Sequence, residues 1–533
     1  MEEQTVRGDA ITEAGRGIAG AAGIIALGNV VSRVLGLVRV TVIADLFGAT
    51  GLVSAYQIAA TVPTMIYDLL IQGMLSSALV PVFSEYATAR MKEELWRIVS
   101  VVLSLTAVAL GLFVVLLELL APQVAWLLGG GFGAELQTVA TASIRIVVPA
   151  VLLLGLSGVV TGLLYTLKRF TYPAFGAAVF NVGIILGALF LNRPLGIYSL
   201  VVGTVLGAGL QLAIQLPGLR GTRLSFSLDL SHPGLRRIAL LYTPIVLGLV
   251  ISQIQVAVDR NLASRTGEQS IAWMQNATHL IQFPHGLVAV AISLAVLPTL
   301  SQLSATADWT GYRRTLAMGL RMVVVFIFPA TVGLFIMAKP IIALIFEHGA
   351  FTTYDTAWTA LALRCYLLGL VFAAVDWPLN YAFYARQDTL TPASVGVLSV
   401  FVYLIVALSL KPLGMIGLVL ADSAKHTAHA LTMLVLLHRR VGSLRGHAVG
   451  ATTFKAALAS AVMGALTYWM IVWLQGVVDV GRLWGELVVV GGAGLAGLIV
   501  YGILVTLMGV EEVKLIRERV RTRLLASLTG SEG

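Results

Sequence analysis

Hydrophobic segments long enough to cross a membrane recur along almost the whole chain. The hydrocarbon core of a bilayer is about 30 Å thick and takes about 20 apolar residues in a helix. Polar residues fall mainly between these segments, and the first segment follows a polar stretch, 1–17, that shows no signal-peptide cleavage pattern. The pattern predicts an all-α polytopic membrane protein with fourteen transmembrane helices, at 18–48, 52–86, 95–121, 137–165, 172–192, 195–217, 235–257, 270–303, 315–337, 355–384, 390–410, 413–437, 455–475 and 484–508.

A second regularity is an internal duplication. Five residues of the first half recur in the second half at offsets of 217 to 219, namely Pro81, Pro122, Arg145, Pro173 and Pro194 as Pro298, Pro340, Arg364, Pro392 and Pro412. Duplication on this scale in an apolar chain is typical of transporters. We therefore predict two six-helix bundles, 18–220 and 233–440, followed by two extra helices in 455–509 and a tail in 510–533.

Composition and charge support a membrane protein and predict its orientation. Hydrophobic residues make up 58% of the 533 residues and charged residues 11%, with a mean hydropathy of +0.92, whereas soluble domains have about 25% charged residues. Sixteen Lys and Arg residues follow even-numbered helices and six follow odd-numbered ones, which predicts that 1–17 and both termini are cytoplasmic. An even number of helices per repeat makes the two bundles parallel. The net charge of +9 then reflects topology and attraction to anionic lipid rather than nucleic acid.

The tail and the single cysteine add little about function. Apolar residues alternate with basic ones in 510–533, as in an amphipathic helix on the inner leaflet. Cys365 cannot form an internal disulfide. The chain has no Walker A sequence and no paired Cys/His spacing of a metal centre. We therefore expect a transporter rather than an enzyme.

Candidate functional residues in the first half are the ionisable groups inside predicted helices, because each costs several kcal/mol without a partner or a wet cavity. Arg33 and Arg39 lie about 120° apart on a helical wheel. Asp68 and Gln72 share one helix face. These residues are either a cationic patch for an anionic headgroup, with Asp68 as its counter-charge, or an Arg–Asp pair that only holds the bundle together.

The second half offers three further groups of candidates. Asp259 either coordinates a cation such as Na⁺ or lies at the outer interface. His279 and Gln282 are polar residues of the eighth predicted helix. A polar stripe on the twelfth helix is either a proton relay, a substrate surface, or a self-neutralising Asp–Lys pair with histidines that reach the inner face; it consists of Asp422, Lys425, His426 and His429.

Several motifs resemble those of the MurJ (MviN) family of lipid II flippases, within the larger group of multidrug, oligosaccharidyl-lipid and polysaccharide exporters. The resemblance covers the first twelve helices and fits the count of fourteen. It is carried by Ser32-Arg33, Gly36, Arg39, Phe47-Gly48-Ala49, Gly73, Leu75-Ser76, Val80-Pro81-Val82-Phe83, "LKRFTYPA" at 167–174, and "SIAWM" and "FPHG" around the eighth helix.

The resemblance implies a function and a location. A member of this family moves an undecaprenyl-pyrophosphate-linked sugar from the inner to the outer leaflet of a bacterial inner membrane by alternating access, for peptidoglycan synthesis. Arg33 and Arg39 would bind the pyrophosphate, and helices in 455–509 would form a groove for the lipid tail. The implied partners are this lipid-linked substrate and membrane lipids, without nucleic acid and without a cofactor. Na⁺, H⁺ or the membrane potential would drive the cycle, and a monomer is expected although the oligomeric state stays open.

The sequence departs from the family pattern at cavity charges. Val40 stands where the family usually has Asp, Asp68 lies where it has an arginine pair, and His279 replaces an arginine. Two explanations compete: a divergent lipid II flippase that uses Arg33, Arg39, His279 and the twelfth helix, or a paralogue that moves another lipid-linked saccharide. A cation-coupled small-molecule antiporter with Asp68 as its coupling site, and a membrane scaffold that transports nothing, are further alternatives.

Overall fold

The structure is a computed structural model that describes residues 2–69, 74–88 and 90–513. Within these residues all regular structure is helical, and no strand occurs. The chain forms two compact units, one ending at Ala272 and the other beginning at Trp273. The division falls near the start of helix α12 (Ser270–Pro284).

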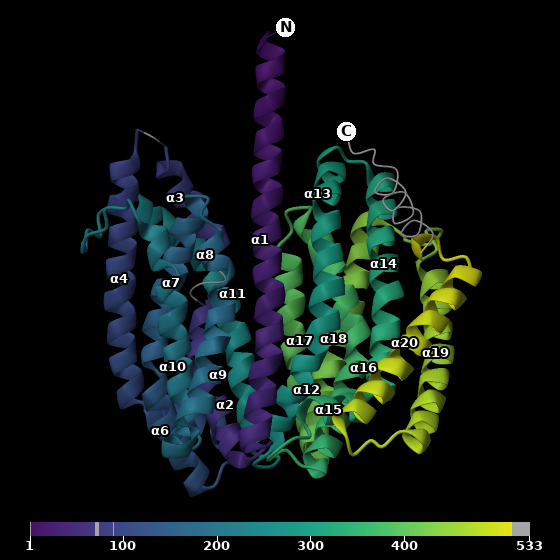
Figure 1. The fold of residues 1–533 in the computed structure, drawn as a ribbon. Helices are drawn as coiled ribbons and strands as arrows, with labels where there is room; N and C mark the ends of the chain where they lie inside the picture. Colours follow the sequence, from purple (N-terminus) through teal and green to yellow (C-terminus); the bar gives the residue numbers. More distant parts are fainter. Residues whose placement is uncertain (1, 70–73, 89, 514–533) are drawn as a thin grey trace. The chain divides into compact units, whose positions relative to one another are not determined.

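In its described residues, the first unit contains eleven α-helices, several of which are labelled in Figure 1. It also holds a π-helix, η2 (Leu75–Leu79), and a 3₁₀-helix, η3 (Leu216–Leu219). The α-helices are α1 (Glu2–Phe47), α2 (Gly51–Tyr67), α3 (Val80–Tyr86), α4 (Lys92–Leu119), α5 (Ala121–Gly129), α6 (Ala134–Val147), α7 (Pro149–Thr166), α8 (Thr171–Ala174), α9 (Gly176–Leu195), α10 (Tyr198–Ala213) and α11 (Pro233–Ser264).

The second unit continues from α12 with the same kinds of element. It holds a second π-helix, η4 (His285–Val290), and a short 3₁₀-helix, η5 (Lys411–Leu413). Its further α-helices are α13 (Ala291–Ala305), α14 (Trp309–Ile336), α15 (Ala338–Phe346), α16 (Thr353–Tyr384), α17 (Leu390–Ser409), α18 (Met415–Val441), α19 (Val449–Val477) and α20 (Leu483–Leu507).

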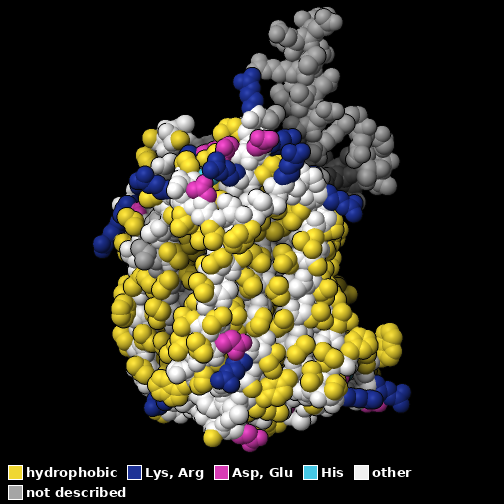
Figure 2. Space-filling model, turned by 90° about the vertical axis from the view of Figure 1, so that its left-hand side faces the viewer, with side chains coloured by type: hydrophobic (Ala, Val, Ile, Leu, Met, Phe, Trp, Pro, Cys, Tyr) yellow, Lys and Arg dark blue, Asp and Glu magenta, His cyan; other side chains and the backbone are white. Residues whose placement is uncertain are grey.

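The predicted all-α membrane architecture is confirmed. Ten helical stretches of the described chain are long and apolar enough to cross a membrane. The other four predicted spans are also helical and correspond to α1, the α2–α3 stretch, α11 and α18. These four carry most of the candidate site residues, so the polar groups are concentrated in the less apolar helices. On the face of the first unit that Figure 2 shows, hydrophobic side chains cover a broad middle belt and charged ones gather mainly toward its two edges.

The duplication extends to backbone details that the sequence pattern did not predict. Pro122 and Pro340 lie in two short helices, α5 and α15, that follow equivalent spans. Lys168 and Gln387, at equivalent positions of the two repeats, both adopt the left-handed conformation, with φ of 57° and 59°. The second span of each repeat contains a π-helix, η2 or η4. The two halves are therefore copies in local structure as well as in proline spacing.

Helix α11 begins the second repeat in sequence but packs within the first unit. The Gly131 amide donates to Ser264 Oγ at 3.0 Å. The Asn261 side-chain amide donates to the Leu127 carbonyl at 2.8 Å. The end of α11 is thus tied to α5 and the turn after it, and the compact units divide later in the chain than the repeats do.

Close helix packing in the first unit depends on glycines of α9 and α10. Gly183 and Gly187 face Gly203 and Gly207, and each pair is spaced by four residues. A Cβ on Gly187 would lie 2.5 Å from the Gly203 Cα and 2.7 Å from the Ser199 carbonyl oxygen. Small residues at this spacing let two backbones approach closely, which is a common way to pack helices in membranes.

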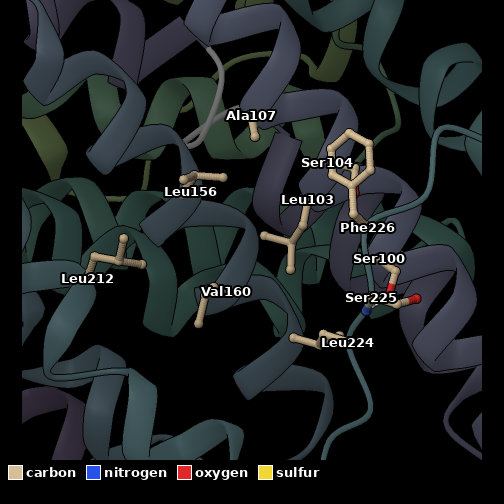
Figure 3. Close-up of a pocket in the computed structure, with 10 residues that line it drawn as sticks. All are labelled: Ser100, Leu103, Ser104, Ala107, Leu156, Val160, Leu212, Leu224, Ser225 and Phe226. Carbon is tan, nitrogen blue, oxygen red and sulfur yellow. Dashed lines mark hydrogen bonds between the residues drawn. The ribbon is translucent and has the colours of Figure 1, made fainter.

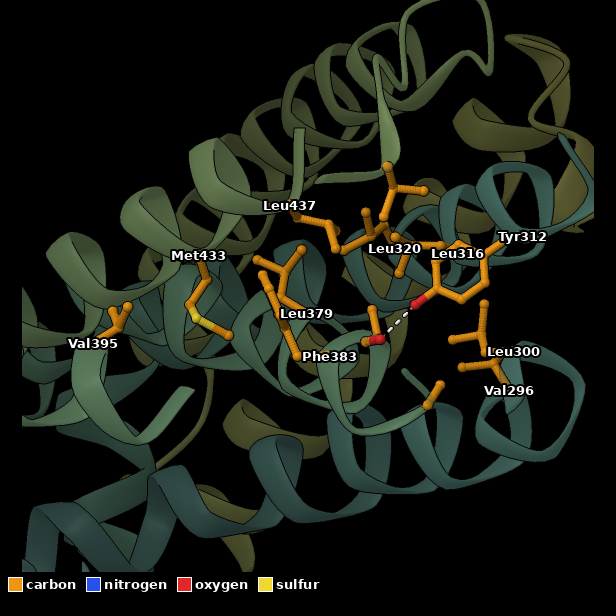
Figure 4. Close-up of a cluster of buried hydrophobic side chains, with 13 residues drawn as sticks. Val296, Leu300, Tyr312, Leu316, Leu320, Leu379, Phe383, Val395, Met433 and Leu437 are labelled. Atoms are coloured by element: carbon orange, nitrogen blue, oxygen red, sulfur yellow. Dashed lines mark hydrogen bonds between the residues drawn. The ribbon is translucent and has the colours of Figure 1, made fainter. Parts of the chain in front are cut away.

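The second unit has its largest described hydrophobic cluster among α13, α14, α16, α17 and α18 (Figure 4). It includes Tyr312, which is fully buried and donates a hydrogen bond to the Ala382 carbonyl. Leu300, Leu316 and Phe383 pack around it without solvent exposure. The cluster holds these five helices together. Helices α16 and α18 also contain polar residues, which are described below.

Candidate functional site

Arginines near helix ends pair with acidic residues from other segments of the same unit. In the first unit, Arg237 binds Glu85 at 2.7 Å and Arg97 binds Asp229 at 2.8 Å. In the second unit, Arg440 binds Asp388 at 3.0 Å. Partial burial raises the pKa of Asp388, but the hydrogen bonds from Thr391 and the positive charge of Arg440 outweigh it, so that the pKa is lowered.

The two arginines of α1 lie on a helix that polar groups hold in place. Arg33 and Arg39 are both half-buried and are separated by roughly 9 Å along the helix axis. The Asn181 side-chain amide of α9 donates to the Ser32 carbonyl at 3.2 Å, one residue from Arg33. Arg39 interacts electrostatically with Tyr56 of α2. Two guanidinium groups thus lie on one helix of the first unit, about 120° apart on the helical wheel.

Asp68 follows α2 and lies beside a polar network inside the first unit. It acts electrostatically on Tyr67, whose hydroxyl is hydrogen-bonded to Gln211 of α10. Gln211 Nε2 donates to Ser157 Oγ of α7 at 3.3 Å, and Gln215 Nε2 donates to the same oxygen at 2.7 Å. The members that join α7 to α10 are uncharged. Gln72 lies outside the described residues.

The polar stripe of α18 separates into two groups of contacts, one around Asp422 and one that joins His429 to α16. Lys425 Nζ lies 2.6 Å from Asp422 Oδ1, and His426 Nε2 lies 3.7 Å from Asp422 Oδ2. His429 instead contacts α16, with its Nδ1 2.7 Å from Asp376 Oδ1. The predicted Asp422–Lys425 pair is confirmed. His429 reaches a partner that the sequence reading missed.

The Asp376 carboxylate is held by its own helix and is almost enclosed. Its side chain is 16% exposed and that of His429 is 12% exposed. Asn380 Nδ2 donates to Asp376 Oδ2 at 2.8 Å. Both oxygens of Asp376 therefore have a defined nitrogen partner, which fixes the orientation of the carboxylate toward α18.

His285, the first residue of η4, adds a second imidazole to this region. Its Nε2 lies 2.9 Å from Trp377 Nε1 and 3.3 Å from the Ala373 carbonyl oxygen. It also interacts electrostatically with Asp376 and with His426. We refer to His285, Asp376, Asp422, Lys425, His426 and His429 as the C-bundle cluster.

The two polar networks occupy equivalent places in the repeat. Ser157 and Asp376 share the sequence offset of the flanking Arg145–Arg364 and Pro173–Pro392 pairs. Gln211 and His429 share the offset of Pro194 and Pro412. The contact between Gln211 and Ser157 in the first unit thus corresponds to the contact between His429 and Asp376 in the second.

The remaining predicted residues are placed separately. His279 Nε2 lies 3.3 Å from Gln275 Nε2 on α12, and Gln282 is exposed. Asp259 lies five residues before the end of α11. The described residues form no group of three or more His, Cys, Asp or Glu that could hold a metal ion. Arg33, Arg39, Asp68 and Asp259 belong to the first unit, and His279, Gln282 and the C-bundle cluster belong to the second.

A pocket of about 360 Å³ in the first unit has a different character (Figure 3). It lies among α4, α7, α10 and the segment 224–226, whose Ser225 amide donates to Ser100 Oγ at 3.0 Å. Its lining consists of serine hydroxyls and apolar side chains such as Leu103, Val160 and Phe226. With no ionisable side chain in its wall, this pocket suits an apolar chain rather than a phosphate.

Comparison with known proteins identifies the family. The profile described as "Lipid II flippase MurJ" matches residues 43–488. The chain belongs to the MurJ family. The match begins at residue 43 and therefore does not include Arg33 and Arg39.

Individual members of the MurJ family agree in sequence and in fold. A lipid II flippase MurJ of Burkholderia cenocepacia is 30% identical over 379 residues, covering 69% of this chain and 73% of the relative. A probable lipid II flippase MurJ of Vibrio cholerae is 30% identical over 477 residues, covering 85% and 90%. A solved MurJ structure in an inward closed conformation superposes with a TM-score of 0.77 at 27% identity, over 91% of this chain and 98% of that one.

The fold also extends beyond the MurJ family. An inward-facing MATE transporter of the MOP superfamily superposes with a TM-score of 0.63 at 14% identity, which indicates a shared fold alone. The relatives are named as flippases and the chain is a helical polytopic membrane protein of a bacterial family. A transporter role at the level of the family follows.

Proposed function

We propose that this protein is a flippase that moves lipid II, an undecaprenyl-pyrophosphate-linked peptidoglycan precursor, from the inner to the outer leaflet of the bacterial inner membrane. The observation that carries the proposal is the MurJ family match over 43–488 together with two arginines on α1, directly before the matched residues. The relatives' names supply the substrate, and the arginines supply the chemistry that binds it.

The charge of the headgroup explains the need for Arg33 and Arg39. A pyrophosphate that enters a membrane protein loses hydration, and guanidinium groups replace it with paired N–H donors at the spacing of phosphate oxygens. The two groups are about 120° apart on the helix, so they suit a bulky diphosphate better than a single small anion. The role of His279 is to supply a donor of its own in place of the arginine usual in the family.

Alternating access is the transport mode that fits this architecture. The chain is built from two copies of one unit, and it shares its fold with MATE transporters solved in inward-facing and outward-facing conformations. The lipid tail stays in the membrane during transport and needs an apolar path. Helices α19 and α20 expose large apolar side chains, among them Trp469, Trp473 and Leu498, and we assign the tail groove to them.

Complementation tests the function. The chain is expressed in a bacterium depleted of its own lipid II flippase, and growth and outer-leaflet lipid II are measured. We expect rescue by the wild type and loss of rescue by Arg33→Ala and by Arg39→Ala at unchanged membrane level. Arg193→Ala removes an exposed arginine near the end of α9 and serves as the matched control, which keeps full rescue.

The possible results separate the candidate functions. Full rescue by both α1 variants contradicts the binding assignment. No rescue by a correctly inserted wild type contradicts lipid II as the substrate; flipping of another undecaprenyl-pyrophosphate glycan by the purified protein then identifies a paralogue of the same scaffold. Efflux of a small cation that Asp68→Asn abolishes would instead establish an antiporter.

A further inference from the structure

The C-bundle cluster has a formal charge that depends on a single proton. It contains two carboxylates, Asp376 and Asp422, and one ammonium, Lys425. With its three imidazoles neutral the cluster carries one negative charge, and with one imidazole protonated it carries none. An uncompensated charge inside a membrane helix bundle is costly. Uptake of one proton therefore removes the net charge of the group.

The cluster lies deep within its helices. Asp422 is roughly 10 Å from the start of α18, and His429 is roughly 18 Å from its end. Asp376 is roughly 12 Å from the end of α16. A 2.7 Å contact between His429 Nδ1 and Asp376 Oδ1 requires one proton between the two atoms. A second proton on the ring then converts the contact into an imidazolium–carboxylate pair.

His285 links the state of this pair to the shape of η4. The indole Nε1–H of Trp377 can only donate, so the 2.9 Å contact requires a lone pair on His285 Nε2. The Ala373 carbonyl, 3.3 Å from the same nitrogen, can only accept. His285 Nε2 cannot make both hydrogen bonds at once, because it accepts from Trp377 only when unprotonated and donates to Ala373 only when protonated. A proton on Nε2 replaces the bond to Trp377 by a bond to Ala373.

Few other charges act on this region. The elements that contribute titratable groups are η4, α16, α17 and α18, with His285, with Asp376, Tyr381 and Tyr384, with the buried Tyr403, and with Asp422, Lys425, His426 and His429, respectively. The sequences of α13 and α17, which pack against these helices, contain no Asp, Glu, Lys, Arg or His. On α14, Arg313 and Arg321 donate to the Val441 and His447 carbonyls at one end of the unit. The cluster thus responds mainly to its own protons.

We propose that the His429–Asp376 pair is the proton-binding site that couples flipping to a proton gradient, with His285 as the group that passes its state to η4. This inference rests on the proposed function for its transported lipid. The pair takes up one proton from one side of the membrane and releases it to the other in each cycle. Protonation neutralises the cluster, and His285 exchanges its Trp377 contact for the Ala373 contact, which reorients η4 against α16.

The chain itself supplies a matched variant without titratable groups. Asp376→Ser with His429→Gln places in the second unit the pair that Ser157 and Gln211 form in the first. Because the same two side chains already pack between equivalent helices, this double variant preserves hydrogen bonding without charge. Membrane level and elution as a single species check its folding. His438→Gln removes an exposed histidine of the same helix and is the control.

Transport is measured in proteoliposomes with fluorescent lipid II, under an imposed pH gradient, a potassium diffusion potential or a sodium gradient. We expect the wild type and His438→Gln to respond to the pH gradient. The double variant should lose that response by about tenfold or more, the factor that corresponds to one pKa unit. An equal response of the double variant, or a wild type that flips lipid II without regard to pH, overturns the proton site and leaves the flippase assignment standing.

A second measurement needs no substrate. Trp377 fluorescence is obtained as the difference between the wild type and Trp377→Phe and is followed as a function of pH, because a protonated imidazole quenches indole. We expect the Trp377 fluorescence to change with pH. The midpoint of this change should shift in the double variant and stay the same in His438→Gln. If this result appears in a protein that flips no lipid II, the proton site stands while the proposed lipid substrate fails. A signal that does not depend on pH contradicts the role of His285.

Discussion

The two repeats place the same helix contacts under different chemistry. In the first, Gln211 of α10 donates to Ser157 of α7, and both side chains are neutral. In the second, His429 of α18 meets Asp376 of α16 at the equivalent positions, and both can titrate. Local backbone features recur as well, such as the left-handed conformation of Lys168 and Gln387. One duplicated scaffold thus carries permanent cations on α1 in its first half and proton-dependent charges in its second.

The loops repeat the same contrast. Arg169, after α7, donates to the Arg220 carbonyl at 2.9 Å. Asp388, at the equivalent position after α16, accepts from Arg440 at 3.0 Å. Both contacts tie the loop after the fourth span of the repeat to the end of the sixth. The same loop position therefore carries an arginine that donates in the first repeat and an aspartate that accepts in the second.

The largest stability difference between the halves is expected at Asp422 and Thr204, which occupy equivalent positions of the two repeats. Asp422→Ala leaves Lys425 without its partner at 2.6 Å. Because the side chains of Asp422 and Lys425 are 30% and 15% exposed, we expect a cost of about 2 kcal/mol, below that of breaking a fully buried ion pair. Thr204→Ala removes one hydroxyl that bonds Leu200 at 2.8 Å, which costs about 1 kcal/mol. The apparent melting temperature in detergent measures both effects.

A charge-neutral control completes this comparison. Asp422→Asn with Lys425→Gln removes both charges and should be more stable than Asp422→Ala alone, because no single charge is left behind. Equal melting temperatures for Asp422→Ala and Thr204→Ala would mean that the ion pair of the second half adds nothing to its structure.

An intermediate difference is expected between a glycine at the close contact of α9 with α10 and a glycine of the second half that lies in open space. Gly187→Val places side-chain atoms against Gly203 and Ser199 of α10, at 2.5 and 2.7 Å for the Cβ alone. Overpacking of this kind costs about 1–3 kcal/mol. Gly396→Val in α17 of the second half meets open space within 4 Å and should stay close to the wild type. Thermal unfolding and yield from the membrane distinguish the two variants, and equal behaviour would contradict the glycine contact.

The smallest effect is expected at the loop pair Arg440–Asp388. The lowered pKa of Asp388 means that this pair stabilises the fold above the ordinary pKa of a carboxyl group and loses its effect as the pH falls through the lowered value. Arg440 is half-exposed, so Arg440→Gln should cost about 0.5 kcal/mol at neutral pH. The difference should vanish in acid. Melting curves as a function of pH test this, and Arg169→Gln, whose partners are carbonyls, should show no such acid dependence.

The architecture could be predicted because each helix that crosses a membrane needs a run of about 20 apolar residues, which is visible in the sequence. Apolar length predicted fourteen spans, each of which is helical in the residues that the structure describes, and proline spacing predicted the duplication. The short helices α5 and α15 were not predicted, because nine residues do not span a membrane. The grouping of α11 with the first unit was also not predicted, because it depends on contacts such as Asn261 with Leu127 that hydropathy does not encode.

The candidate site could be predicted only in part. Asp422 and Lys425 are three residues apart, so helical periodicity brings them together. His429 and Asp376 lie 53 residues apart on different helices, and no local spacing joins them. Asp376 did carry a signal, since it is an acidic residue inside an apolar span, the same feature that singled out Asp68. Aligning the two repeats position by position, at the offsets of their prolines, would have paired it with Ser157.

Within residues 2–69, 74–88 and 90–513, π-helical turns occur only in the second span of each repeat, and they give it a mechanical property that a continuous α-helix lacks. A straight α-helix of fifteen residues, such as α12 or α13, is a rod about 22 Å long. Helices bend sharply at π-turns, and a bend of about 20° moves the far end of such a rod by about 7 Å. Helices α12 and α13 are thus two rigid segments joined by η4, at which the span can bend. His285 lies at this bend, so a small displacement of its imidazole would produce a much larger displacement at the far ends of α12 and α13.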